Sequence, residues 1–219
     1  MSDSASSAGI ERARSLGGSP LVLFIVYRTA ADAAARGYED WLCAVDNPFF
    51  NAIPGIRHYA NWIVEDAEAA PPFSHFDFLG LERAEDLERV WFNPELDAFR
   101  RGWVAKWGYG PAPQDMHRFT YGMRTARTDA TADAGEAWLY GGIGPAPDQL
   151  GTVFETSFSL AKHFASDGEG RPSDWRLPAA QRNPLGCDWV GLAPHRITSL
   201  DSGDGTIFAY PARCIAKPG

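Results

Sequence analysis

A continuous apolar run, Leu21–Tyr27 (LVLFIVY), constrains the fold of this chain more than any other segment. Valine, isoleucine and aromatic residues favour strands, and the run has no charged position that would suit a solvent-facing side. The turn-forming sequence Gly17-Gly18-Ser19-Pro20 precedes it and marks its start. We therefore predict a buried strand, of the kind found in a sheet that is covered on both faces.

The next segments alternate between helical and strand patterns. Residues 30–50 and 84–107 carry apolar side chains at helical spacing, and Asn93-Pro94 should divide the second helix into two pieces. Residues 57–65, 73–82 and 117–124 have the composition of strands. The resulting order, strand-helix-strand-strand-helix-strand, is the split βαβ plan. We thus predict an α+β protein with a ferredoxin-like domain over residues 19–124.

The two remaining parts of the chain are less regular. Residues 1–18 are rich in Ser and Ala and lack the apolar core of a secretion signal, so we expect a disordered tail. Residues 125–219 show short strand patterns without clear helices. They are expected to form a β-rich extension packed on the first domain, and a degenerate second repeat of that domain is the alternative.

Three short motifs within residues 20–110 resemble a known superfamily. They are Tyr38-x-x-Trp41 in the first helix, Pro54-Gly55-Ile56 before the second strand and Asn93-Pro94 in the second helix. With the order of elements, they resemble the dimeric α/β barrel superfamily, and within it the EthD-like, HapK-like and stress-responsive barrel proteins and the small polyketide cyclases. The resemblance implies a homodimer in which two sheets pack face to face around a mostly apolar pocket. It departs from the plant-type cyclases, whose His-Pro-x-His stretch corresponds here to Asn93–Leu96.

Composition and charge exclude several partners and compartments. The formal net charge is −8, which repels phosphate backbones, so we expect no nucleic-acid partner. No apolar run approaches the roughly 18 residues of a membrane-spanning helix, so we expect no membrane insertion. The 3 cysteines have no metal-binding or redox spacing, which suits structural thiols in the cytoplasm.

Strand periodicity groups four polar residues on one face of the predicted sheet. Tyr59 and Asn61 alternate with Ala60 and Trp62 in the second strand, and His75 and Asp77 alternate with phenylalanines in the third. We expect the apolar faces to pack on the helices. The polar face should then be the open face of the sheet, which lines the pocket in a dimeric barrel.

These four residues suggest acid–base chemistry. His75 near Asp77 is a candidate general base with an orienting carboxylate, Tyr59 a donor to a developing oxyanion, and Asn61 a group that positions a carbonyl. The alternative is structural: residues two apart on a strand are neighbours whether or not they react, and such a face can equally be solvated or lie in a dimer interface.

Other candidates for substrate binding lie at strand ends. Arg57 can hold a carboxylate bidentately, although a surface ion pair serves it equally well. Tyr27 and Arg28 end the first strand, and His117 starts the fourth. Asp46 and Asn47 also fall near an expected barrel mouth, on topology alone. His58 alternates with this face and is expected to be a buried, hydrogen-bonded histidine.

The sequence offers no strong signal for a cofactor. The five histidines show no metal-ligand spacing, and no dinucleotide or phosphate-binding fingerprint is present, so we expect neither metal nor cofactor. The favoured function is a cofactor-independent lyase, cyclase or isomerase, with decarboxylation and retro-aldol cleavage included, acting on a hydrophobic aromatic small molecule. The alternatives are a cofactor-free or haem-dependent monooxygenase on the same fold and a non-catalytic binding or accessory protein.

Overall fold

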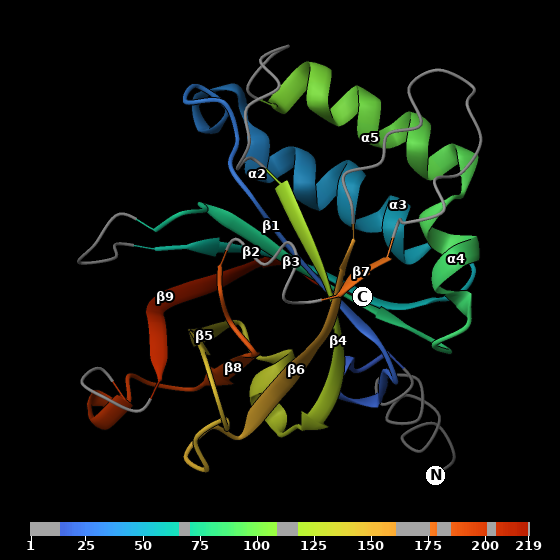
Figure 1. Cartoon of the computed structure of the whole chain (residues 1–219). Coiled ribbons are helices and arrows are strands. Elements are labelled where there is room, and N and C mark those ends of the chain that lie inside the picture. The colour runs from blue at the N-terminus through green and yellow to red at the C-terminus, as the bar shows by residue number, and fades with distance from the viewer. Residues whose placement is uncertain are drawn as a thin grey trace, which may run out of the picture.

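The computed structural model describes residues 14–65, 71–108, 118–160, 176–178, 185–200 and 205–218, and within them the dominant element is a curved antiparallel sheet (Figure 1). Its strands are β1 (Val22–Tyr27), β2 (Ile56–Val64), β3 (His75–Leu81), β4 (Arg118–Arg127), β5 (Glu136–Gly142), β6 (Thr152–Leu160), β7 (Arg176–Pro178), β8 (Trp189–Ala193) and β9 (Thr206–Ala216). The helices are α2 (Tyr38–Trp41), α3 (Asn47–Asn51), α4 (Asp86–Trp91) and α5 (Pro94–Trp107), and a π-helical turn, Leu42–Asp46, joins α2 to α3. Short 3-10 helices cover Leu16–Gly18, Ala34–Arg36, Ala130–Asp133 and Thr198–Leu200.

The sheet closes on itself into an eight-stranded barrel within one chain. Its strands follow the order β4-β1-β3-β2-β9-β5-β8-β6, and β6 pairs back to β4, while β7 adds to β6 beside the ring. Every pairing is antiparallel, for example Trp62 opposite Cys214 between β2 and β9, and Thr120 opposite Leu160 between β4 and β6. The ring therefore leaves none of its eight strands with an open edge.

The predicted fold class and the family resemblance are wrong on this evidence. The ferredoxin-like unit was expected to complete a barrel with a second copy, whereas β9, β5, β8 and β6 of the same chain close it. β4 crosses the expected domain boundary after residue 124 and pairs along its length with β6, so residues 125–218 supply half of the ring. The motifs behind the resemblance describe local elements, and local elements do not determine what pairs with a sheet edge. The homodimer was expected because a second chain would complete the barrel, and this chain completes its barrel without one.

The interior of the barrel is filled by large side chains from alternate strand positions. Phe24, Phe76 and Phe78 pack with Trp62, Phe73, Tyr121 and Phe154, and the rings of Phe24 and Phe78 stack with centroids 5.3 Å apart. Leu16 of the N-terminal 3-10 helix also packs in this cluster. In an eight-stranded barrel, side chains of this size occupy the lumen.

Helices cover the outer face of β1, β2 and β3 (Figure 1). Leu23 and Ile25 of β1 face outward into a second core with Tyr38, Leu42 and Leu96 of the helical layer. All six residues of β1 are buried, so the predicted buried strand is confirmed. The expected break between two helical pieces is also confirmed, because Asn93 caps α5 by accepting from the backbone N–H groups of Glu95 and Leu96.

In the part of the chain that the structure describes, every helix is too short or too polar to cross a membrane.

Candidate functional site

Two buried carboxyl groups meet between the sheet and the helical layer. Asp77 lies on β3 directly opposite Asn61 of β2, and Asp46 ends the π-helical turn above them. Asp46 is 3%, Asp77 2% and Asn61 0% exposed. Carboxyl groups are seldom so deeply buried without compensating partners, so their surroundings decide what they can do.

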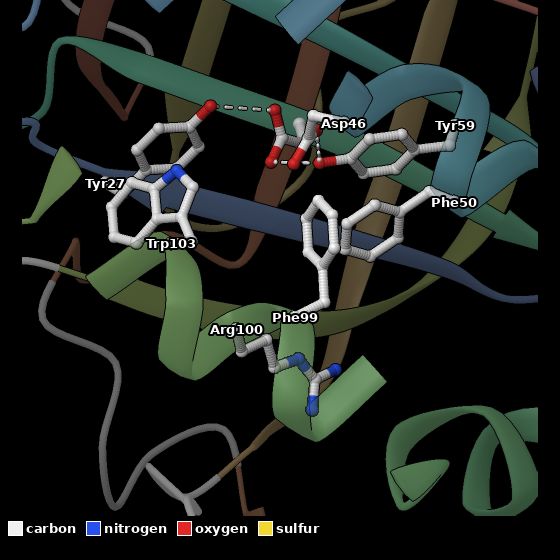
Figure 2. Close-up of a pocket in the computed structure, with 8 residues that line it drawn as sticks. Tyr27, Asp46, Phe50, Tyr59, Phe99, Arg100 and Trp103 are labelled. Carbon is white, nitrogen blue, oxygen red and sulfur yellow. Dashed lines mark hydrogen bonds between the residues drawn. The ribbon is translucent and has the colours of Figure 1, made fainter. Parts of the chain in front are cut away.

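Tyr59 and Asn61 bridge the two carboxyl groups. The Tyr59 hydroxyl oxygen lies 2.9 Å from Asp46 Oδ2 and 2.9 Å from Asp77 Oδ2 (Figure 2). Asn61 Nδ2 donates to Asp46 Oδ2 at 2.9 Å and to Asp77 Oδ1 at 3.0 Å. A phenol has one hydrogen, so Tyr59 either shares it between the two carboxylates or donates it to one of them while the other carboxyl is protonated and donates to the Tyr59 oxygen. The geometry thus fits two carboxyls that hold one proton between them, as like-charged pairs at short distance do.

A chain of hydroxyl groups reaches Asp77 from the other side. Trp103 Nε1 donates to the Tyr38 hydroxyl at 2.9 Å, Tyr38 lies 3.3 Å from the Tyr27 hydroxyl, and Tyr27 donates to Asp77 Oδ1 at 3.1 Å. Burial, followed by the charge of Asp77, raises the pKa of Tyr27 well above its usual 10.0. Tyr27 therefore keeps its proton and remains a donor to the carboxylate throughout the physiological range.

Two asparagines of α3 hold the bridging residues in place. Asn47 Nδ2 donates to Asn61 Oδ1 at 3.1 Å and to the Tyr59 carbonyl at 2.9 Å. Asn51 Oδ1 accepts from the Tyr59 backbone N–H at 2.9 Å. The preceding π-helical turn rotates the helix so that Asp46 faces the sheet while Val45 is 42% exposed. Turns of this type are frequent at functional sites.

A narrow pocket leads to the carboxyl pair. It is lined by Tyr27, Asp46, Phe50, Tyr59, Asp77, Phe99, Arg100 and Trp103, and its free space is about 10 Å³, roughly the room that one water molecule needs (Figure 2). Phe99 and Trp103 come from α5 and form an aromatic wall opposite the carboxyls. Arg100 points away from the pair in Figure 2 and lies over the ring of Trp91, 3.9 Å from its centroid.

His75 lies beside this network without lining the pocket. Its ring stacks on Tyr27 with centroids 5.5 Å apart, and its Nδ1 lies 2.9 Å from the Ser74 hydroxyl. Burial lowers the pKa of His75 to about 4, so the ring is neutral at physiological pH. The structure therefore places His75 where it supports Tyr27.

The remaining predicted residues are dispersed. Arg28 donates to the main-chain carbonyls of Pro71 and Pro72, and Arg57 Nε donates to the Ser15 carbonyl at 3.4 Å. Neither lines the pocket. His58, expected to be buried, is buried and lies 2.6 Å from the Arg14 carbonyl through Nδ1. His117 lies outside the described residues.

The polar residues were grouped correctly but were assigned to the wrong layer. Tyr59, Asn61 and Asp77 do meet on one face of the sheet, yet that face lies under the helices, and the face of Ala60 and Trp62 lines the barrel interior. Both faces are covered, so alternation alone does not distinguish them. Asp46 was named from topology only. Its signal is helical spacing, since it lies four residues after Leu42 and eight after Tyr38, which are both buried.

Across the described segments, no three His, Cys, Asp or Glu side chains are placed so that they could hold a metal ion. Comparison with known protein families, with curated proteins and with solved structures found no match for this chain.

Proposed function

We propose that this protein is an acid–base enzyme, of the isomerase, cyclase or lyase type, that acts on a small hydrophobic aromatic molecule at the Asp46–Asp77 carboxyl pair. The observation that carries the proposal is the Tyr59 hydroxyl, which lies 2.9 Å from both carboxyls at the end of an aromatic-walled pocket. This arrangement keeps a proton donor and a proton acceptor side by side, away from bulk water.

The energetic cost of the pair supports a functional role. Burying two carboxyls together is unfavourable, and apolar side chains of similar size usually stabilise a core at least as well. The neighbouring core between sheet and helices is built from such residues, among them Leu23, Ile25 and Leu79. Costly ionisable clusters in clefts are characteristic of sites where chemistry occurs.

The proposed reaction begins with proton transfer at a carbon next to a carbonyl group. The ionised carboxyl accepts the proton from carbon, and the protonated carboxyl gives its proton to the carbonyl oxygen, which yields the enol. The first carboxyl then returns its proton to another carbon of the conjugated enol while the second takes back the enol O–H proton, which completes an isomerisation. In a ring closure, the enol carbon attacks a second carbonyl, whose oxygen takes the proton of the first carboxyl while the enol O–H proton returns to the second. Tyr59 relays the shared proton, while Tyr27 stabilises the charge of Asp77 by hydrogen bonding.

Substrate entry requires the aromatic wall to move. The free space of about 10 Å³ is too small for an aromatic ring, and Phe99 is stacked on Phe49 with centroids 4.0 Å apart. Phe99 and Trp103 are only half-buried, so their side chains are the ones positioned to make way. A substrate ring would then pack against Phe50 in place of Phe99.

One observation favours a second candidate, a non-catalytic binding protein. The barrel interior is filled with its own aromatic side chains and the pocket beside it is narrow. In such a protein, the carboxyl pair would bind a ligand donor without transferring protons.

Exchange of carbon-bound protons with D₂O distinguishes the two. We expect 2-tetralone, phenylacetone or phenylpyruvate, followed by NMR, to lose α-protons faster with the protein than without it. Asp77→Asn and Asp46→Asn should each lower that rate by about 100-fold or more. Asp97→Asn is the matched control, because its carboxylate pairs with Arg101 on the surface of α5. Equal rates in all variants would contradict the enzyme proposal.

A further inference from the structure

A second hollow lies where the start and the end of the described chain meet. It is a groove of about 540 Å³ between α3 and the end of β9, within the size range of small-molecule sites. Arg14 enters it from the N-terminal side and Lys217 from the C-terminal side. Of the described residues that line the groove, these two are cations and none carries a carboxylate.

The local charge of the groove is opposite in sign to the net charge of the chain. The chain carries a formal net charge of −8, yet two cations line one groove. Lys217 Nζ donates to the main-chain oxygen of Asp133 at 2.9 Å, a neutral acceptor, and among the described residues no carboxylate forms an ion pair with this ammonium group. The Asp133 carboxylate is bound by Ser15 Oγ at 2.5 Å and by the Leu16 backbone N–H at 3.1 Å. The groove therefore favours an anion.

The rest of the lining determines what kind of anion fits. Asn51 adds an amide, and Pro48 and Ile215 provide apolar walls. An inorganic ion would form ionic contacts with the cations but would leave the apolar walls of the groove exposed to water. A carboxylate with an apolar body uses both, because its charged end meets the cations while its body removes apolar surface from water.

We propose that this groove is a binding site for a small organic carboxylate with an apolar body, held between Arg14 and Lys217. The site is separate from the carboxyl pair, although Asn47 contributes to both, and the proposal does not depend on the proposed function. Binding would link the N-terminal segment to the end of β9.

The exposed thiol of Cys43 lines the groove and reports on its occupancy. Burial raises the pKa of Cys214 to about 11 and that of Cys187 to about 12, so iodoacetamide at neutral pH reacts preferentially at Cys43. The probes are 2-naphthoate, its neutral analogue 2-naphthamide, and inorganic phosphate. The readout is the alkylation rate of Cys43 in the full chain, followed by mass spectrometry.

We expect 2-naphthoate to protect Cys43 saturably and the two other probes to protect it at least tenfold less well. In the double variant Arg14→Gln/Lys217→Gln, protection should require at least tenfold more 2-naphthoate than in the wild type. In Lys217→Gln alone, it should require at least threefold more. The control Arg101→Gln/Arg124→Gln removes two cations from exposed ion pairs elsewhere and should change nothing.

Four results would overturn the proposal. Equal protection by 2-naphthamide would show that charge is not recognised, and equal protection by phosphate would show that the apolar walls contribute nothing. Unchanged protection in both Lys217 variants would show that Arg14 and Lys217 do not bind the carboxylate. Loss of protection in the control would show that binding depends on the net charge of the protein and not on the two cations of the groove.

Discussion

At the scale of single residues, the hydroxyl of Tyr59 has one hydrogen to donate and two carboxyl oxygens at 2.9 Å. Tyr59 and Asn61 supply three N–H and O–H hydrogens towards Asp46 and Asp77, and a proton on one carboxyl group would complete the second short contact of Tyr59. A residue that supplies this hydrogen permanently should relieve the cost of the site and abolish its chemistry. Stability and activity are expected to change in opposite directions.

Asp77→Asn tests this trade-off. An amide nitrogen at the Oδ2 position donates to the Tyr59 oxygen, and Tyr59 can then donate to Asp46. We expect the free energy of unfolding at pH 7 to rise by roughly 1 kcal/mol. Urea unfolding measures it, with Asp97→Asn as the reference variant. A loss of more than 1 kcal/mol would show that both carboxylates stabilise the fold.

His75 gives the protein a defined sensitivity to acid. Burial lowers its pKa from 6.5 to about 4, so the folded state requires the neutral ring. Below pH 6.5 the unfolded chain takes up a proton that the folded chain does not, and stability falls until about pH 4. At about 1.4 kcal/mol per pH unit, the loss over this window is about 3 kcal/mol.

The comparison of wild type with His75→Phe isolates that contribution. Phenylalanine retains a ring to stack on Tyr27 but does not titrate. The unfolding free energy of the variant should fall less steeply than that of the wild type between pH 6.5 and 4, and the two curves should run parallel above pH 7. Parallel curves over the whole range would mean that His75 does not titrate in this window.

At the scale of elements, α5 links helix stability to the site. It begins at the Asn93 cap and carries Phe99 and Trp103, which wall the pocket. The cap was predictable, because Asn before Pro at a helix start is a local signal. The π-helical turn was not, because one extra residue per turn leaves no local mark in the sequence.

Asn93→Ala should lower the free energy of unfolding by about 1 kcal/mol, because the backbone N–H groups of Glu95 and Leu96 lose their acceptor. Asn93→Asp keeps an acceptor and should remain within about 0.5 kcal/mol of the wild type. Chemical denaturation of the three proteins under one buffer condition measures both effects. Equal losses in the two variants would attribute the effect to packing rather than to capping.

At the scale of the whole molecule, the seam between β4 and β6 is the feature that sequence reasoning missed. Residues 19–124 and 125–219 were predicted to form a domain and a separate extension, yet residues 118–127 pair with residues 152–160 to close the ring. Strand composition indicated several of the strands, such as β1, because burial and branching are local properties. Pairing partners are not local, so the local patterns of a chain that closes its own barrel resembled those of a chain that forms a barrel with a second copy.

Gly122 shows how tightly the seam is packed. A Cβ at this position would lie 2.2 Å from the ring of Phe158 on β6. We expect Gly122→Ala to cost about 1–3 kcal/mol of stability. Gly102→Ala, in α5 with open space around it, should instead stabilise by about 0.5–1 kcal/mol. Thermal unfolding of both variants compares them, and a neutral Gly122→Ala would show that the seam adapts.

Closure of the ring also sets an order of events during synthesis. β2 pairs with β9, for example Trp62 with Cys214, so β2 lacks this neighbour until β9 has been synthesised. Such distant pairings make folding slow. Until residues 206–216 have left the ribosome, β2 and β5 both present an unpaired edge to other chains. The nascent protein is therefore most prone to aggregate just before β9 emerges, and most dependent on chaperones at that moment.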